Sequence, residues 1–424
     1  MGGLRMSETG RWTTLHNRDF ALVCCARFAV TLAIHVANVA IGWYIYDVTG
    51  SAFALAYLGL AGLIPALTLV LLTGYVADRI DRRLVLFGSD LVLTATGLVL
   101  HWLVMSGGSI VWPIYLVVMA VSASRAFHNP AAQAIIPALV PPEQLQSAIA
   151  LSSSVFQSAQ ILGPALGGIL YALDPKLPFA IASALYGISA LASLAVRHRS
   201  APAPGKMPLS IKSLMAGFDF ACRKPVIFGA VALDAAVVML GGVVVLLPIF
   251  AKDILQVGPL GLGLLRAAPA FGAVLMALWL ANNDFVAHGT GRKLFGTIGI
   301  YGIATGLFGL STSFPLSLLL LIIVGASDMI SVVIRHTMVQ AETPDDLRGR
   351  VAAVNSLFLS SSSELSQFRA GTVAGLIGAG PAVFIGGLMA ASLSLIWPLL
   401  FPGLAARKHL IEPPSENRHE EAKA

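Results

Sequence analysis

Charged residues are scarce in this sequence. Asp, Glu, Lys and Arg together make up 11% of the 424 residues, hydrophobic residues make up 57%, and the mean hydropathy is +0.82. A soluble domain carries about 25% charged residues. Because this much apolar surface cannot be hidden inside one soluble core, the composition excludes an ordinary soluble protein and indicates that lipid solvates much of the chain.

The apolar runs also lack the period-two alternation of barrel strands. In lipid every backbone amide must be bonded internally, which leaves helices or closed barrels, and a helix needs about 20 residues to cross the hydrocarbon. Runs of that length predict an all-α polytopic membrane protein with twelve transmembrane helices. The predicted spans are residues 20–46, 52–77, 84–106, 110–136, 144–173, 176–196, 225–251, 259–282, 293–312, 314–338, 350–376 and 380–403.

Cysteine and the signatures of enzymes are nearly absent. Of the three cysteines, Cys24 and Cys25 lie in the first span and Cys222 lies in a basic loop, so we expect no disulfide framework. The first apolar run is too long for a signal peptide. No Walker loop, metal-ligand spacing or nucleophile elbow is found. We therefore expect no cofactor, no metal, no ATP drive and no enzymatic activity.

The basic residues are distributed by topology. A net charge of +6 and a pI of about 9.3 would suit nucleic-acid binding, but the basic residues fall between apolar spans rather than on one patch, so we expect no nucleic acid. With the N-terminus inside, 20 of the 27 Lys and Arg residues lie in cytoplasmic tails and loops, and only Lys176 and Lys252 face outward. This asymmetry predicts that both termini are cytoplasmic.

The sequence divides into two halves. We expect a six-helix bundle at 1–196, a cytoplasmic linker at 197–224, a second six-helix bundle at 225–404 and a cytoplasmic tail at 405–424. Part of the Pro-rich, basic linker, from Ser210 to Cys222, is compatible both with an amphipathic surface helix and with a solvated tether. A weak repeat supports the halves: Pro-Glu-Gln-Leu and Pro-Asp-Asp-Leu precede the fifth helix of the first and second half.

The loop between the second and third spans carries the strongest motif. It reads Gly-Tyr-Val-Ala-Asp-Arg-Ile-Asp-Arg-Arg over residues 74–83. This resembles the loop signature of the major facilitator superfamily, and the resemblance implies a cytoplasmic gate that opens when the halves rock. The alternative is a purely topological basic loop, and Asp81 stands where the family usually has glycine. The gate residues carried over are Gly74, Asp78, Arg79, Arg82 and Arg83.

The fifth span contains Gly163, Pro164, Gly167 and Gly168 in the order Gly-Pro-x-x-Gly-Gly. The motif resembles the core of the one carried by drug–proton antiporters within the superfamily. Proline kinks a helix, and the glycines let another helix approach closely. The resemblance favours export over import, whereas an ordinary kinked packing helix is the alternative.

Three further segments, residues 45–51, 130–140 and 246–251, resemble the enterobactin-exporter-like branch of the superfamily, the transmembrane secretion effectors. The likeness runs from about residue 15 to residue 405. It implies the major facilitator fold, with two pseudo-symmetric six-helix bundles, and an exporter of a small molecule in a bacterial plasma membrane. It does not supply the cargo.

Polar residues inside the spans recur every three or four positions, which places them on single helix faces. Such faces predict a polar substrate cavity, because charges at membrane depth usually face a cavity or a partner. The alternative is a set of bonds between helices, and we expect Arg266 to be structural. The cavity candidates are Arg27, His35, Asn38, Arg125, Gln157, Gln160 and Arg369.

The carboxylates within the spans are candidates for proton coupling, because burial makes protonation near the working pH accessible. We expect this role first for Glu364, then for Asp234, with Asp328 as a third candidate. The chain is therefore predicted to be a monomeric, proton-coupled exporter of an amphiphilic or polar small molecule. A nutrient importer of the same fold, and a non-transporting scaffold or membrane enzyme, are the alternatives.

Overall fold

The computed structural model describes residues 17–69, 72–73, 76, 79–107, 110–199 and 211–410. Helices dominate all of these segments. The first half contains α2 (Arg18–Thr49), α3 (Ala52–Thr68), α5 (Arg82–Met105), α6 (Trp112–Leu139), η2 (Pro142–Gln144), α7 (Leu145–Leu173) and α8 (Leu177–Ala195). The second half contains α10 (Pro225–Gly241), η3 (Val244–Leu246), α11 (Leu247–Ile249), η4 (Phe250–Ile254), α12 (Gly258–Ala281), η5 (Phe285–Ala287), α13 (Thr290–Leu310), α14 (Phe314–Glu342), α15 (Asp345–Ile377), α16 (Ala379–Leu400) and α17 (Pro402–Ala405).

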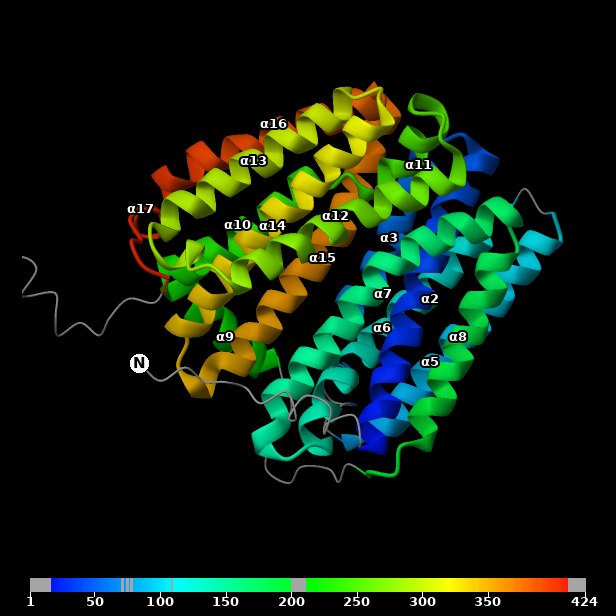
Figure 1. Cartoon of the computed structure of the whole chain (residues 1–424), viewed down its shortest axis with the longest axis horizontal. Helices are drawn as coiled ribbons and strands as arrows, with labels where there is room; N and C mark the ends of the chain where they lie inside the picture. The colour runs from blue at the N-terminus through cyan, green and yellow to red at the C-terminus, as the bar shows by residue number, and fades with distance from the viewer. Residues whose placement is uncertain are drawn as a thin grey trace, which may run out of the picture.

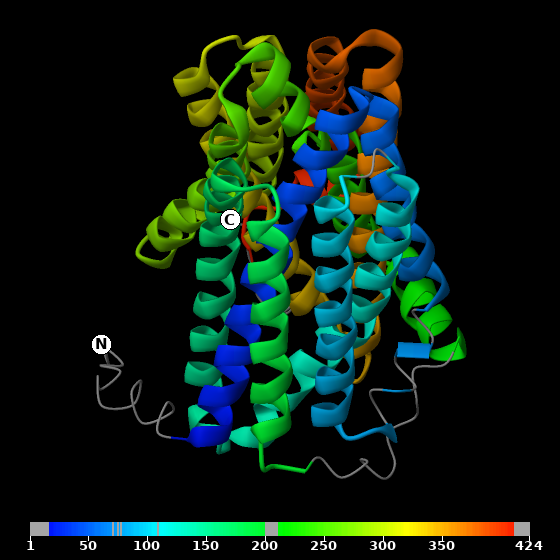
Figure 2. The ribbon, with the colours of Figure 1, turned by 90° about the vertical axis from the view of Figure 1, so that its right-hand side faces the viewer.

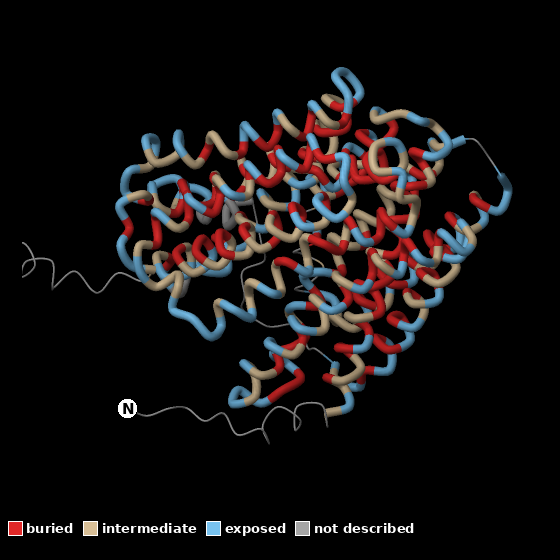
Figure 3. The backbone as a smooth tube through the Cα atoms, turned by 45° about the horizontal axis from the view of Figure 1, so that its top comes forward, coloured by how far each residue is buried: buried red, intermediate tan, exposed pale blue. Residues whose placement is uncertain are grey.

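The apolar helices account for the predicted crossings. Among the described residues, eight helical segments are long and apolar enough to cross a membrane, and α10 to η4 count as one of them. The shorter apolar helix α3 and the long but more polar α6, α7 and α15 bring the crossing elements to twelve. Exposed residues recur along the outer sides of the bundles (Figure 3), and many of them are apolar: Leu376, Leu395 and Leu399 are 73%, 75% and 81% exposed. Lipid, not water, is the medium for such a surface.

The helices form two bundles. In the first, α2 packs against α7 and α8, and α5 packs against α8; in the second, α13 packs against α16, and α12 packs against α14. Figure 1 shows the first bundle in blue to green and the second in green to red. The helices of the first bundle stand side by side in Figure 2.

Two helix pairs join the bundles: α3 packs against α15, and α7 packs against α12. Because α3 and α12 are the second crossings of their halves, and α7 and α15 the fifth, the two contacts are pseudo-symmetric equivalents. Glycines allow the approach. A Cβ on Gly168 would lie 2.5 Å from the Pro259 carbonyl oxygen, and one on Gly371 would lie 2.7 Å from the Cα of Ala56. The halves are therefore in direct backbone contact.

We call the end of the bundles where α8 ends and α10 begins the linker end, and the opposite end the distal end. Helix α9 (Ile211–Arg223) lies at the linker end. It covers most of the segment from Ser210 to Cys222, for which the sequence allowed either an amphipathic helix or a solvated tether. Phe218 of α9 stacks on Phe358 of α15 with ring centroids 6.0 Å apart. The bundles converge toward the distal end and diverge toward the linker end, as Figure 1 shows.

The seventh crossing, expected at 225–251, is found as one apolar segment at Pro225–Ile254, and its helix is broken after Gly241. Helix α10 ends at Gly241, and the chain continues through a 3-10 turn, one α-turn and the π-helix η4. Carbonyl groups freed inside a membrane need new donors. Arg369 of α15 supplies them, since its Nε donates to the Met239 oxygen at 2.8 Å and its Nη2 to the Leu240 oxygen at 2.7 Å.

Residues 407–410, after α17, pack against the turn between α12 and α13 at the linker end of the second half. We call this segment the clasp. The amide nitrogens of Gly289 and Gly291 donate to the carbonyl oxygens of Lys408 and Arg407, at 2.6 and 3.0 Å. The amide of Leu410 returns a bond to this turn, and Arg407 forms an ion pair with Glu342 at the end of α14.

Candidate functional site

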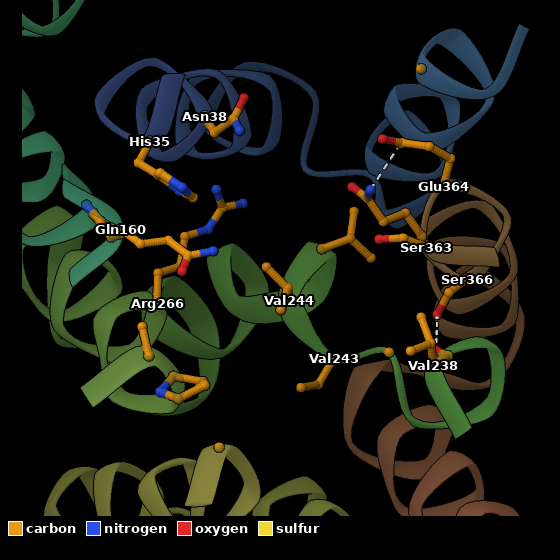
Figure 4. Close-up of a pocket in the computed structure, with 18 of the residues that line it drawn as sticks. His35, Asn38, Gln160, Val238, Val243, Val244, Arg266, Ser363, Glu364 and Ser366 are labelled. Atoms are coloured by element: carbon orange, nitrogen blue, oxygen red, sulfur yellow. Dashed lines mark hydrogen bonds between the residues drawn. The ribbon is translucent and has the colours of Figure 1, made fainter. Parts of the chain in front are cut away.

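A cavity of about 610 Å³ lies between the two bundles, and both halves contribute to its wall. Volumes of this order are typical of small-molecule sites. Figure 4 shows His35, Asn38, Gln160 and Arg266 on one side of it, and Ser363 and Glu364 on the opposite side. Its polar and charged lining residues are His35, Asn38, Ser122, Arg125, Gln157, Gln160, Arg266, Tyr301, Asp328, Ser363, Glu364, Ser366 and Gln367.

The polar faces of the first half meet in this cavity. His35 and Asn38 project from α2, Arg125 from α6, and Gln157 and Gln160 from α7. The helices α6, α7 and α15 are also the long ones that lack the full apolar character of a membrane span. Each of these three helices places at least two polar or charged side chains in the cavity wall, where such groups are tolerated at membrane depth.

Glu364 lies where α15 crosses α3. A Cβ on Gly62 of α3 would lie 2.6 Å from Oε2 of Glu364, so the carboxylate rests directly on the other half of the protein. Gln367 Nε2 donates to the same oxygen at 2.9 Å (Figure 4). Arg125 is the cation whose charge acts on Glu364, but the two form no ion pair in the described structure. The carboxylate thus has access to the cavity and contact with both bundles.

Asp234, Asp328 and Arg335 form a charged cluster in the second half. Arg335 is 2% exposed, and its Nη2 lies 2.8 Å from Asp234 and 3.8 Å from Asp328. The guanidinium makes no well-aligned hydrogen bond, so the attraction is chiefly electrostatic. Asp328 lines the cavity, whereas Asp234 is 5% exposed and lies behind the wall. The coupling roles of both acids remain predictions.

Two residues expected in the cavity lie outside its described wall. Arg27 is directed elsewhere, because its Nη1 donates to Ser152 Oγ at 2.9 Å and its guanidinium lies over the Phe156 ring. Arg369 is occupied by the carbonyls at the end of α10. Both arginines have polar neighbours, but these neighbours are groups of the protein.

Two charged residues were not among the predicted site residues. Arg266, expected to be structural, lines the cavity; its signal is that it is the single charged residue of α12. Asp90 of α5 is 0% exposed and accepts a hydrogen bond from Ser189 at 2.6 Å, with His128 Nε2 3.3 Å from its other oxygen. This cluster ties α5, α6 and α8 together. A lone Asp within an apolar span was its only sequence signal.

The gate loop is described in part, and Gly74 and Asp78 lie outside the described residues, with Arg79 within them. Arg82 Nη1 donates to the Ala134 oxygen at 2.8 Å, and Arg83 Nη1 donates to the Val196 oxygen at 3.0 Å. These arginines thus bind carbonyls near the ends of α6 and α8, where cations are favoured. Asp81, in place of the family's glycine, caps α5 by accepting from the Arg83 amide at 3.1 Å.

The Gly-Pro motif of α7 is placed between two helices. A Cβ on Gly163 would lie 2.5 Å from the His35 Cβ, and one on Gly167 would lie 2.8 Å from the Val36 oxygen, both on α2. Gly168 faces α12, and the Pro164 oxygen lies 2.6 Å from the position of a Cβ on Gly263. The motif therefore lets α7 contact its own half and the other half at once.

Reciprocal polar contacts close the distal end. Tyr46 donates a hydrogen bond to Asp253, and Lys252 Nζ lies 2.6 Å from the Asp47 carboxylate. Each half therefore contributes one carboxylate and one donor from adjacent positions. The broken seventh crossing positions the second pair, since both of its residues belong to the π-helix η4.

Comparison with known proteins agrees with this geometry. The model of a family described as transmembrane secretion effector matches residues 9–415. The enterobactin exporter EntS of Shigella boydii serotype 4 is 29% identical over 342 residues, which are 78% of this chain and 79% of that protein. Macrolide efflux protein A of Streptococcus pyogenes is 34% identical over 138 residues, 32% of this chain and 34% of that relative's length.

The fold has solved counterparts. A bacterial homologue of the iron transporter ferroportin, crystallised in an inward-facing state, matches with a TM-score of 0.67 at 17% identity, over 92% of this chain and 99% of that one. At this identity the match speaks for the fold alone. The family match over nearly the whole chain, the paired bundles and the cavity between them lead to one assignment: the chain belongs to the transmembrane secretion effector family and is a multi-pass membrane transporter of the major facilitator superfamily.

Proposed function

We propose that this transporter exports a small amphiphilic or polar molecule from a bacterial cytoplasm in exchange for protons, acting as a monomer in the plasma membrane. The cargo binds in the cavity between the bundles, in contact with His35, Asn38, Gln157 and Gln160. Alternating access then follows from rocking of the two bundles about this site.

The position of Glu364 carries the proposal. Its carboxylate borders the cavity and rests on Gly62 of the opposite half, at the α3–α15 crossing. Protonation removes a charge from this contact and alters the balance with Arg125, so a single proton changes how the halves fit together. This links proton binding to the relative position of the bundles, which coupling requires.

The orientation follows from the excess of Lys and Arg predicted for the linker-end loops, which favours the cytoplasm for that end. The described conformation then faces the cytoplasm, with Tyr46 and Lys252 in the contacts that close the outer side. An exporter loads its cargo in this conformation.

The named relatives suggest the first cargoes to try, enterobactin and a macrolide. The decisive experiment measures their uptake into inverted membrane vesicles with an imposed pH gradient. Glu364→Gln keeps the shape of the side chain and resembles its protonated form. We expect gradient-driven accumulation to vanish in this variant, while exchange of cargo across the membrane without a gradient persists.

A matched control is Glu143→Gln, which makes the same substitution at an exposed carboxylate of η2 outside the cavity wall. It should retain a response to the gradient. If Glu364→Gln still accumulates cargo in proportion to the gradient, Glu364 does not couple protons. If no cargo accumulates in vesicles from cells that express the native chain at high level, while uptake into whole cells rises, the importer alternative replaces export.

A further inference from the structure

Arg266 has no carboxylate partner among the described residues. It projects from α12 into the cavity, and its Nε is buried with no hydrogen-bond partner. No ion pair or hydrogen bond joins it to any described residue. Gly42 of α2 leaves room for it, because a Cβ there would lie 2.9 Å from Nη2. The protein thus makes space for this guanidinium without neutralising it.

Two other arginines within the spans have protein partners. Arg335 has Asp234 at 2.8 Å, and Arg369 donates to two carbonyl oxygens. Arg125, like Arg266, lines the cavity. An unpaired charge taken out of water costs several kcal/mol. Water can solvate Arg266 while the cavity is open, but when the bundles close around cargo, a counter-charge has to come from the cargo.

The neighbours of Arg266 add neutral hydrogen-bonding groups. Figure 4 shows its side chain extending toward the side of the cavity where His35, Asn38 and Gln160 project. Glu364 projects from the opposite side in the same view. The guanidinium of Arg266 and the carboxylate of Glu364 therefore lie on opposite sides of the cavity.

Apolar side chains fill much of the remaining wall. They come from the stretch beyond the break in α10 and from α2, α3, α6 and α14. The members are Ile41, Leu55, Leu58, Val118, Val121, Val243, Val244, Val245 and Val324. A cargo that fits this lining has a hydrophobic body and one polar end.

We propose that the cavity takes an amphiphilic anion of the carboxylate type, whose head group is held by Arg266 and whose apolar body lies along Val243–Val245. The inference rests on the proposed function, because it names the chemical class of the cargo for the same cavity. A guanidinium suits this role, since its planar fork matches a carboxylate through two parallel hydrogen bonds. The carboxylate of Glu364 repels an anion, which favours an orientation with the carboxylate head of the cargo toward α2 and α12.

The test compares two probes that differ in one charge, dansyl-undecanoic acid and its methyl ester. Fluorescence titration is carried out on the full chain in nanodiscs of zwitterionic lipid, with empty nanodiscs as the blank. We expect the acid to bind the native protein about tenfold more tightly than the ester, in line with loss of a charge-assisted hydrogen bond. Arg266→Gln should abolish this preference and leave the affinity for the ester unchanged.

Two variants complete the design. Arg266→Lys keeps the charge but loses the fork, so it should retain part of the preference. Arg27→Gln removes a guanidinium that binds Ser152 instead of bordering the cavity, and should retain all of it. The proposal is overturned if the native protein binds the acid no better than the ester, or if Arg266→Gln weakens both probes alike.

These outcomes are separate from those of the coupling experiment. If the acid binds through Arg266 but the vesicles show no gradient-driven transport, the anion site stands and proton-coupled export does not. If transport follows the gradient while acid and ester bind equally, export stands and the anionic class is wrong.

Discussion

At the scale of single residues, the guanidinium of Arg369 offers a sharp test of what holds the broken seventh crossing. Arg369→Met removes two charge-assisted bonds to α10 carbonyls and leaves these carbonyls without donors. We expect this to cost about 3 kcal/mol and to lower the melting temperature of the purified protein. Arg369→Lys should restore little, because a single ammonium lacks the forked geometry. Arg27→Met, which loses one bond to Ser152, is the control; equal melting of all three variants and the native chain would contradict this role.

The same scale shows what spacing can and cannot predict. The three-residue offset puts His35 and Asn38 on one face of α2, and both border the cavity. Arg266 is the single charged residue of α12, and Asp90 is the single acidic residue of α5. No periodic pattern of charges therefore reveals which way they face. Whether such a residue meets water, an acid or a serine is decided by neighbouring helices, which a single sequence does not place.

At the scale of helices, the glycine contacts between α7 and α12 make a prediction with an internal control. Gly168→Ala places a methyl group 2.5 Å from a carbonyl oxygen of α12, so the helices must move apart. Overpacking of this kind costs about 1–3 kcal/mol, and the melting temperature should fall. Gly187→Ala on α8 meets no atom within 4 Å and should melt at or slightly above the native temperature. A fall of equal size in both would show that the effect comes from losing glycine, not from the crossing.

Helix boundaries were largely accessible from the sequence. The first crossing was expected at 20–46 and is found at Arg18–Thr49, with Asn17 as its cap and Gly50 in the left-handed conformation after it. The extent of the break after Gly241 was less accessible, because hydropathy continues across Gly241-Gly242. Donors on α15, Arg369 and Ser366, bond to carbonyl oxygens at the end of α10, and the sequence does not show this pairing.

At the scale of the whole molecule, orientation is the property that decides the direction of transport. We predict that reporters fused after Arg199 and after Leu410 both report the cytoplasm, because Lys and Arg concentrate in the loops of the linker end. A reporter in the turn at Gly50, which lies at the distal end, should give the opposite signal. Alkaline phosphatase activity marks a fusion point in the periplasm, and green fluorescent protein fluorescence marks one in the cytoplasm. A periplasmic signal from Arg199 would reverse the assignment of both ends.

The helical class and the number of crossings followed from composition and run length. The division into two bundles was expected from the linker, the weak repeat and the resemblance to the major facilitator superfamily. The pairing of α3 with α15 and of α7 with α12 was less accessible. It depends on glycines that match across helices far apart in sequence, such as Gly168 and Gly263. A glycine in one helix carries no sign of its partner in the other.

The clasp formed by residues 407–410 has a consequence for biosynthesis. These residues follow α16 and α17, so the ribosome releases them only after the described helices have been made. Until then the turn that holds Gly289 and Gly291 lacks its backbone partners, and Glu342 lacks Arg407. A nascent chain interrupted just before Arg407 would hold every described helix and yet present an unfinished edge, which is the kind of surface that membrane quality-control proteases can recognise.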